Sequence, residues 1–405
     1  MNTITTKEER LYQRVAPLFE LYESAKANGT YFYNRPIQKF LDGGKVVVNG
    51  KVMGMYASYG YLGLLNHPRI NAAAQREIDK FGTGTHGVRT LAGTLPIHNE
   101  LERTIADFKH AEDAITYSSG YATNLSVIST LLGRRDYVFS DKLNHASIVD
   151  GCALSGAQFK RFRHRDMKHL ERRLKDAPKD VTKLVIADAV FSMDGDIIDL
   201  PSMVDLCEKY DAWLMIDEAH SVGVLGKTGR GIEEYFGLGD VVDLKMGTLS
   251  KTIPSVGGYV ASTNKMIEML RFTSRAYIFS AALPPAQAAA ANEAFKVILD
   301  EPERIEKLNA NAKQFISGLQ ACGFNTLDTE TAVVPVICGS VEKALLATKY
   351  AHENGVFVLP VISPAVPPGL ERLRATVTAA HDPEEIDRAI EVIHQAGKKA
   401  GVLPA

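Results

Sequence analysis

The chain has 405 residues, of which 45% are apolar and 23% are charged. That composition is typical of a folded, enzyme-sized protein and excludes a disordered or collagen-like chain. Lys and Arg number 46 against 48 acidic residues, which gives a net charge of −2. Because no global positive field results, we expect no nucleic-acid partner and no attraction to an anionic membrane.

The cysteines and the apolar stretches bear on location. Four cysteines lie far apart in the sequence, with no pair at metal-ligand spacing, so we expect a reduced, cytoplasmic protein without a metal site. The first 14 residues carry five charged side chains and lack the apolar core of a signal peptide. No uncharged stretch is typical of a transmembrane segment.

Residues 1–58 predict an N-terminal arm followed by a small ribbon. Apolar residues at helical spacing indicate a helix within the first 30 residues, which Asn28-Gly29 ends. Two short apolar runs then flank Asn49-Gly50, a dipeptide that strongly indicates a β-hairpin. We therefore expect a two-stranded ribbon over residues 45–53.

Residues 59–290 predict a large α/β domain. Apolar strand candidates alternate with helical patterns, which predicts a mostly parallel sheet with helices on both faces. The predicted strands are residues 114–117, 137–140, 184–189, 213–217, 241–246 and 258–261.

Residues 291–405 predict a smaller α+β domain at the C-terminus. Two long helical patterns, over residues 284–299 and 302–321, lead into it. The further predicted elements are strands 332–338, 356–359 and 372–377 and helices 341–354 and 383–397.

Two motifs resemble nucleotide sites without their context. Gly82, Gly84 and Gly87 have the spacing of a dinucleotide-binding fingerprint, but they follow a helical pattern where that motif needs a strand. The stretch 217–220 spells Asp-Glu-Ala-His, as in helicases, yet no phosphate loop of the required spacing precedes it. We therefore expect neither a dehydrogenase nor a helicase.

Two charged residues stand where parallel strands are predicted to end. Lys251 follows the strand candidate 241–246, and Asp217 ends the strand candidate 213–217. Ligands of open α/β sheets bind at the carboxyl ends of the strands. There, a lysine can form a Schiff base with pyridoxal phosphate (PLP), and a carboxylate can hold the proton of its pyridinium ring. The alternatives are a surface lysine and a carboxylate that caps a helix.

Two predicted helix starts add to this pattern. Ser119-Gly120-Tyr121 joins a strand to a helical pattern, and the free amides of a helix N-terminus bind phosphate. His145 opens the next helical pattern and could stack on a planar ring, while His220 could donate to a ring oxygen. An ordinary helix cap and a capping or surface histidine are the alternatives.

Together these motifs resemble the α-oxoamine synthases, PLP-dependent enzymes of fold type I. The resemblance covers about residues 60–381, and the ordered set is specific although each motif alone is weak. The matching stretches are Tyr61-Leu-Gly-Leu64, Gly93-Thr94, Ser119-Gly120-Tyr121, Asn144-His145-Ala-Ser147, Phe191-Ser-Met-Asp-Gly-Asp196, Asp217-Glu-Ala-His220, Gly247-Thr-Leu-Ser-Lys251, Ile278-Phe-Ser280, Leu283-Pro-Pro285, Leu373-Arg374 and Thr378-Ala-Ala-His381.

The resemblance implies a role for each matching residue. Lys251 would bind PLP as a Schiff base and then remove the α-proton of the substrate. Asp217 would pair with the pyridine nitrogen, His220 would pair with the phenolic oxygen, and His145 would stack over the ring and contact the substrate. The other implied cofactor contacts are Ser119, Gly120, Tyr121 and Thr248 at the phosphate, Ser192 near the ring oxygen, and Ser280 at the phosphate of the partner subunit in a homodimer.

The family reaction joins an amino acid to an acyl thioester with loss of carbon dioxide. The resemblance therefore implies an acyltransferase whose acceptor is Ser, Ala or Gly and whose donor is an acyl-CoA or acyl-carrier-protein thioester. Residues 355–369 resemble the bacterial serine palmitoyltransferases more than the glycine-using members. Glycine C-acetyltransferase and 8-amino-7-oxononanoate synthase activities stay open, as does an aminotransferase or aldolase on the same fold.

The chain departs from the family pattern at two places. Tyr59 stands where many members have an asparagine that contacts the substrate carboxylate, and Ile362-Ser363-Pro364 stands where several have an arginine before a Pro-Pro run. Arg374 then becomes the candidate carboxylate ligand, because a guanidinium pairs with a carboxylate through two hydrogen bonds; a structural arginine is the alternative. The basic run over residues 160–165 could hold a thioester phosphate, but a solvated charge run is the more ordinary interpretation.

Overall fold

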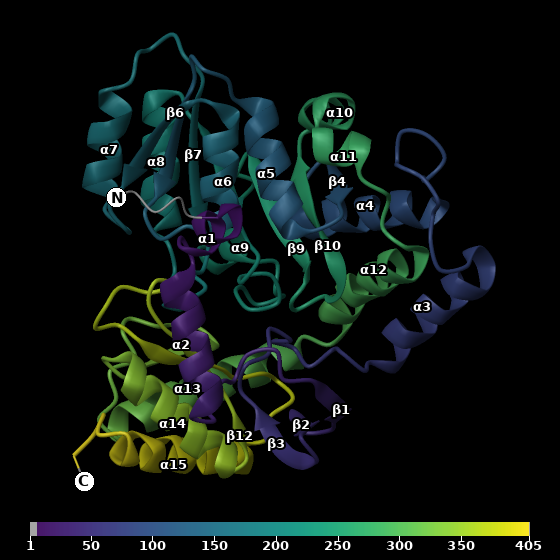
Figure 1. Ribbon diagram of the computed structural model, residues 1–405. Coiled ribbons are helices and arrows are strands. Elements are labelled where there is room, and N and C mark those ends of the chain that lie inside the picture. Colours follow the sequence, from purple (N-terminus) through teal and green to yellow (C-terminus); the bar gives the residue numbers. More distant parts are fainter. Residues whose placement is uncertain (1–5, 405) are drawn as a thin grey trace.

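The computed structural model describes residues 6–404 and is built around a seven-stranded sheet (Figure 1). The strands stand in the order β4-β10-β9-β8-β7-β5-β6. From β9 to β6 all neighbours are parallel, whereas β10 is antiparallel to both β4 and β9. The strands are β4 (Asp113–Tyr117), β5 (Tyr137–Asp141), β6 (Gln158–Phe162), β7 (Lys183–Asp188), β8 (Trp213–Asp217), β9 (Leu244–Ser250) and β10 (Pro254–Ser262).

Helices cover both faces of this sheet. They are α3 (Pro68–Phe81), α4 (Pro96–Lys109), α5 (Gly120–Leu131), α6 (Ala146–Ser155), α7 (Met167–Lys175), α8 (Leu200–Tyr210), α9 (Ile232–Tyr235), α10 (Asn264–Thr273), α11 (Arg275–Phe279) and α12 (Pro285–Asp300). Successive side chains of a strand point to opposite faces, so Val185 joins the core under α4, α7, α8 and α12, while Ile186 joins the core under α5, α6 and α10. The predicted fold class, a mostly parallel sheet with helices on both faces, is confirmed.

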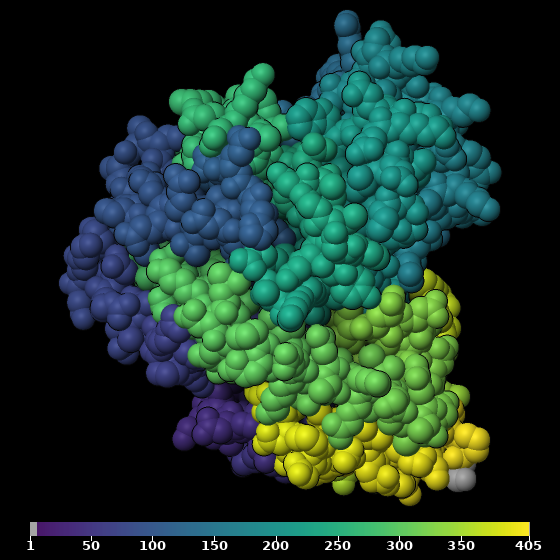
Figure 2. All heavy atoms as spheres, turned by 180° about the vertical axis from the view of Figure 1, so that it is seen from behind, coloured from purple at the N-terminus to yellow at the C-terminus, as the bar shows by residue number. Residues whose placement is uncertain are grey.

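The N-terminal and C-terminal segments of the chain lie together in the lower part of the molecule (Figure 2). The predicted hairpin forms from β2 (Lys45–Val48) and β3 (Lys51–Met55), with β1 (Ile37–Leu41) on one side and β12 (Val356–Phe357) on the other. A three-stranded antiparallel sheet, β11-β14-β13, completes the predicted smaller α+β part. The remaining elements are α1 (Lys7–Tyr12), α2 (Ala16–Ala27), α13 (Glu303–Ala321), β11 (Val333–Ile337), α14 (Val341–Glu353), β13 (Leu359–Val361), β14 (Arg372–Thr376) and α15 (Pro383–Lys399).

Two predicted elements are each divided in the structure. The N-terminal helix is two helices, α1 and α2, with Pro17 in the first turn of the second. Residues 1–5 of that predicted helix lie outside the described residues. The strand predicted over residues 356–359 is also two, since β12 pairs with the ribbon and β13 with β14.

The strand predicted over residues 241–246 is shifted along the chain. The amides of Val241 and Val242 donate to the side chain of Glu233 at 3.0 Å, which takes them out of the strand ladder. Pairing with β10 extends the other end to Ser250, so Thr248 lies within β9 and Lys251 directly follows it. The sequence pattern misses β6 altogether, because its basic residues hide an edge strand.

Candidate active site

Three neighbouring parallel strands deliver charged residues to one edge of the sheet. Asp188 ends β7, Asp217 ends β8 directly opposite it, and Lys251 follows β9. His145 precedes α6 and His220 follows β8, so both reach the same edge. The rule that ligands bind at the carboxyl ends of parallel strands places a candidate active site here.

Lys251 lies between an imidazole and an aromatic ring. Its Nζ is 2.9 Å from Nε2 of His220 and 5.7 Å from the ring centre of Tyr59. Burial lowers the pKa of Lys251 to about 8, although Asp217 and Asp188 oppose that effect. Near neutral pH, more of this lysine is therefore neutral amine than in an exposed lysine, and the neutral amine is the nucleophilic form.

His220 is buried and stays neutral. Its Nδ1 lies 2.5 Å from the hydroxyl of Tyr61. Burial, followed by the positive charges of Lys251 and Arg374, lowers the pKa of His220 well below its usual value. A neutral imidazole has one proton and one lone pair, so it can donate one hydrogen bond and accept another.

Asp217 is fixed by two hydrogen bonds. Its Oδ2 accepts from Nδ2 of Asn124 at 2.7 Å, and its Oδ1 accepts from the amide of Ala219 at 2.9 Å. The second contact forms a local turn; because no helix begins directly after Asp217, the alternative of a helix-capping carboxylate is not what the structure shows. The first reaches across to α5, and it orients the carboxylate at the strand end.

His145 caps α6 and is tied to the same strand ends. Its Nδ1 accepts from the amide of Ser147 at 3.2 Å, and its own amide donates to Oδ2 of Asp188 at 3.1 Å. Burial lowers the pKa of His145, while Asp217 opposes the shift. The capping alternative is thus present, and it holds the imidazole beside Asp217 and Lys251.

The N-terminus of α5 forms a cradle beside Thr248. Ser119 caps the helix by accepting from the amide of Ala122 at 3.1 Å. A Cβ on Gly258 would lie 2.7 Å from Cα of Gly120, so this close approach of two backbones requires glycine, and a Cβ on Gly120 would lie only 3.1 Å from Oγ1 of Thr248. The first amides of a helix have no partner within it, and they suit a phosphate.

Tyr121 belongs to this first turn through its backbone. Its side chain points elsewhere: the hydroxyl hydrogen-bonds to Asp150, and the ring centre lies 6.4 Å from that of His145. The predicted phosphate contact of Tyr121 therefore concerns its amide and not its phenol.

Arg374 on β14 carries a buried donor without a partner. Its Nε donates to the carbonyl of Ser192 at 2.7 Å and its Nη1 to Oγ1 of Thr376 at 3.3 Å. Within the described residues its Nη2 is buried and unpaired. The guanidinium carbon lies 4.8 Å from the ring centre of Tyr59. Because buried donors are nearly always satisfied in folded proteins, this one fits a ligand carboxylate.

A cavity of about 520 Å³ opens beside these groups. Lys251 and Tyr59 line it together with apolar side chains from β1, from residues 356–359 and from the segments that flank the ribbon. These apolar side chains include Phe32, Ile37, Phe40, Leu65, Phe357 and Leu359. The candidate site therefore combines a lysine and charged groups with an apolar space.

The residues fit PLP. Asp217 is positioned for a ring nitrogen, the α5 N-terminus with Thr248 for a phosphate, and Lys251 for a carbonyl carbon. Ser280 is the predicted site residue that the structure does not bring to this group: it follows α11, next to the bridge between Val88 and Ala281. Its predicted contact lies in a second subunit, so it stays a prediction.

The basic run of β6 has partners of its own. Lys160 and Arg161 lie over the rings of Tyr137 and Phe159. Arg163 pairs with Asp166 at 3.1 Å, and Arg165 pairs with Asp196 at 3.2 Å. These contacts favour the interpretation of a partly solvated charge run on an edge strand.

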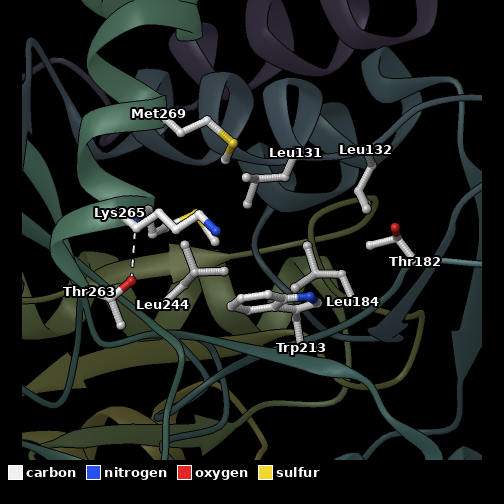
Figure 3. Close-up of a pocket in the computed structure, with 10 residues that line it drawn as sticks. Leu131, Leu132, Thr182, Leu184, Trp213, Leu244, Thr263, Lys265 and Met269 are labelled. Carbon is white, nitrogen blue, oxygen red and sulfur yellow. Dashed lines mark hydrogen bonds between the residues drawn. The ribbon is translucent and has the colours of Figure 1, made fainter.

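A second cavity lies at the opposite ends of the same strands (Figure 3). Its volume is about 430 Å³, and Leu131, Leu184, Trp213, Leu244 and Met269 are among the residues that line it. None of the predicted site residues lines this cavity.

Across residues 6–404 no group of His, Cys, Asp and Glu is arranged for a metal ion, and no helix has the length and apolarity to cross a membrane.

Sequence reasoning missed three residues of the site. Asp188 ends its strand as Asp217 does, so the strand-end rule alone could have found it. Asn124 lies four residues after Gly120 on α5, which places both on one helix face. Tyr61 belongs to a recognised motif, but no local pattern reveals that its hydroxyl meets a histidine 159 residues away.

Comparisons with known proteins agree with this geometry. The family model "Aminotransferase class I and II" matches residues 53–393. The 8-amino-7-oxononanoate synthase 1 of Bacillus velezensis is 44% identical over 93% of this chain and 96% of its own length. The serine palmitoyltransferase of Sphingobacterium spiritivorum is 41% identical over 97% and 98%.

A solved structure is similar over nearly the whole chain. It is a serine palmitoyltransferase from S. paucimobilis in which alanine replaces a lysine, with PLP and myriocin bound. The two chains are 35% identical, the match covers 97% of this chain and 100% of that one, and the TM-score is 0.94. The chain described here therefore belongs to the α-oxoamine synthases, PLP-dependent acyltransferases within the class I and II aminotransferase family.

Proposed function

We propose that this protein condenses an amino acid with an acyl thioester, with loss of carbon dioxide, in the manner of a serine palmitoyltransferase. The acceptor would be Ser, Ala or Gly, and the donor an acyl-CoA or an acyl-carrier-protein thioester. One observation carries the proposal: the ring of Tyr59 contacts both Lys251 and the guanidinium of Arg374, whose Nη2 is unpaired, and it lines an apolar cavity. A base, a carboxylate ligand and space for an acyl chain thus adjoin one another.

Each residue has a proposed task in this reaction. PLP, when bound, supplies the electron sink for negative charge at the α-carbon. Asp217 keeps the ring nitrogen protonated, while Ser119, Thr248 and the amides of Gly120 and Tyr121 hold the phosphate. His145 covers one face of the ring and orients the substrate.

Proton transfer and substrate binding fall to three further residues. Lys251 takes the α-proton and returns a proton to the same carbon after the acyl group has been joined, the thiol released and carbon dioxide lost; a pKa of about 8 suits both directions near neutral pH. Arg374 binds the amino-acid carboxylate through its unpaired Nη2, held in place by the carbonyl of Ser192. Tyr59 covers the guanidinium and borders the acyl space, which limits the size of the acceptor side chain.

The proposal includes a cytoplasmic homodimer that shares its active sites. Leu91 is 84% exposed and Phe279 is 72% exposed. They lie near the two ends of the β-bridge between Val88 and Ala281, which is next to Ser280. Large apolar side chains exposed together are typical of a subunit contact. All four cysteines are free, which supports a reduced compartment. Light scattering gives the oligomeric state, and mixed dimers of Ser280→Ala and Lys251→Ala chains test whether the sites are shared.

The function is tested by titrating the purified PLP-bound protein. Gly, Ala and Ser are added in turn while the visible absorption of the cofactor is followed, and acyl-CoA thioesters of increasing chain length follow. We expect a spectral shift with one amino acid, then release of free thiol and carbon dioxide in equal amounts. Conversion of the cofactor to its amine form without thiol release would instead indicate an aminotransferase.

The alternative within the family is 8-amino-7-oxononanoate synthase activity, favoured by the 44% identity to that enzyme of Bacillus velezensis. Mass spectrometry of the product separates the two activities, since each acceptor and acyl chain gives its own mass. Formation of 8-amino-7-oxononanoate would establish the alternative, and a product built on a two-carbon acyl group and glycine would indicate a glycine C-acetyltransferase.

A further inference from the structure

Tyr61, His220 and Lys251 form a hydrogen-bonded line that ends at the lysine. The hydroxyl of Tyr61 lies 2.5 Å from Nδ1 of His220, and Nε2 of the same ring lies 2.9 Å from Nζ of Lys251. The side chain of Tyr61 is completely buried, and His220 is 6% exposed. The proposed function gives the hydroxyl of Tyr61 no task.

The line can hold its protons in two ways. In one arrangement Tyr61 donates to Nδ1, so the ring proton of His220 lies on Nε2 and points at Lys251. In the other, Nδ1 carries the proton and donates to the oxygen of Tyr61, while Nε2 accepts from the Lys251 ammonium. Because burial lowers the pKa of His220 well below its usual value, its ring stays neutral and has only one proton to place.

The hydroxyl of Tyr61 distinguishes the two arrangements. Among residues 6–404 Nδ1 of His220 is the acceptor within reach of this hydroxyl, because the other polar group beside it, the guanidinium of Arg374, can only donate. In the second arrangement the hydroxyl proton would be buried without an acceptor, which is unfavourable. In the first, every proton of the line has a partner, since a neutral Lys251 amine accepts from Nε2. Burial lowers the pKa of Lys251 to about 8, so this neutral amine predominates only above about pH 8.

We propose that Tyr61 is a positioning residue that fixes His220 in the tautomer with its proton on Nε2, so that the ring donates toward Lys251 and toward an acceptor bound beside it. The inference rests on the proposed function only for the identity of that acceptor, an oxygen of PLP. Without the hydroxyl, Nδ1 is free to carry the proton, and Nε2 becomes an acceptor for the Lys251 ammonium.

The tautomer can be observed directly by nuclear magnetic resonance. The full-length protein is labelled with ¹⁵N-histidine and measured with PLP bound and again after PLP removal, and a His220→Gln variant assigns the signals. We expect Nε2 of His220 to be protonated and Nδ1 to be bare in the wild type. A proton on Nδ1 would overturn the proposal, and this measurement needs no Tyr61 variant that folds.

Removing the hydroxyl supplies the second test. In Tyr61→Phe we expect a mixture of both tautomers, together with a rise of about 0.5 or more in the pKa of Lys251, measured on the PLP-free protein from the pH dependence of its reaction with an aldehyde. Unchanged His220 signals in this variant would contradict the proposal.

The matched control is Tyr56→Phe. Tyr56 is also buried, and its hydroxyl donates to the carbonyl of Glu385 at 2.9 Å, away from Lys251. This variant should lose stability but keep the His220 signals and the pKa of Lys251.

Failure of the proposed function can be told apart from failure of this inference. A wild type with the expected tautomer but no thioester-dependent product would overturn the proposed function and leave the role of Tyr61 intact.

Discussion

The two ends of the same strands have opposite character. Strand β8 begins at Trp213, in an apolar cavity, and ends at Asp217, in the candidate active site. Strand β9 begins at Leu244 in that apolar cavity and leads directly into Lys251. Mostly apolar side chains line one end, whereas the other end gathers charges that the fold leaves partly unsatisfied.

Charge pairing marks the difference most clearly. Lys245, near the start of β9, is buried and pairs with Glu233 at 3.5 Å and with Asp240. Lys251, after the end of the same strand, has no ion-pair partner among the described residues. Burying a charge without a partner is costly, so a fold keeps such a group where a ligand completes it. The unpaired groups therefore locate the function, and the paired ones stabilise the fold.

Replacing each of the two lysines in turn is the strongest test of this contrast. Lys251→Ala should abolish Schiff-base formation and lower turnover by about 10⁴-fold or more, because the nucleophile and the base are lost together. Lys245→Met should lower the melting temperature while PLP still binds at Lys251. Borohydride reduction followed by peptide mass spectrometry identifies the modified lysine. Full turnover in Lys251→Ala would sink the assignment.

Adjacent carboxylates offer the next test. Asp217→Asn should lower turnover by about 10²- to 10³-fold, since an amide cannot hold the proton of the ring nitrogen. Its neighbour Glu218 forms a buried ion pair with Lys109 at 2.6 Å, so Glu218→Gln should reduce stability and spare most of the rate. Turnover is compared with the free energy of urea unfolding. Equal losses of rate in the two variants would contradict the contrast.

Two arginines of β14 test substrate binding. Arg374→Lys should raise the KM for the amino acid about tenfold and leave the KM for the thioester unchanged, because a single ammonium cannot both keep the contact with the carbonyl of Ser192 and offer a second, fixed nitrogen to the carboxylate. Arg372 donates to Asp194 at 2.5 Å and to two carbonyls, so Arg372→Lys should alter stability instead. An unchanged amino-acid KM in Arg374→Lys would remove its proposed role.

The smallest expected effect, a change of a few fold at one pH, is that of Asp188→Asn on the pH dependence of PLP uptake. Burial lowers the pKa of Lys251 to about 8, and the neutral amine is reactive, so the rate of PLP binding to the PLP-free protein should rise with pH and level off above about pH 8. Asp188 opposes that lowering, so Asp188→Asn should move the plateau to lower pH. Stopped-flow absorbance gives both profiles. A rate that still climbs toward pH 10 would show that Lys251 titrates as an exposed lysine.

Local patterns predicted the parts of the site that depend on one strand or one helix start. Lys251, Asp217 and Ser119 each stand at such a junction, and the hydrophobic alternation that reveals the sheet also reveals its strand ends. The same alternation placed β9 too early, because Glu233 draws the amides of Val241 and Val242 away from the ladder.

Contacts between distant segments could not be predicted in this way. Asn124 meets Asp217 across 93 residues, and Tyr61 meets His220 across 159. The unpaired Nη2 of Arg374 is another such result, since a sequence can suggest an arginine as a ligand but cannot show that one of its nitrogens lacks a partner. Only the packed structure separates satisfied from unsatisfied groups.

The ribbon also sets an order of assembly. Gly54 of β3 pairs with Val356 of β12, and the amide of Tyr56 donates to Phe357, so the partners are about 300 residues apart. During synthesis the hairpin leaves the ribosome early, and the strand that covers its edge leaves near the end. Until then β3 exposes an unpaired edge, which is a site for mispairing between nascent chains. A chain that stops short of residue 356 would keep that edge open permanently.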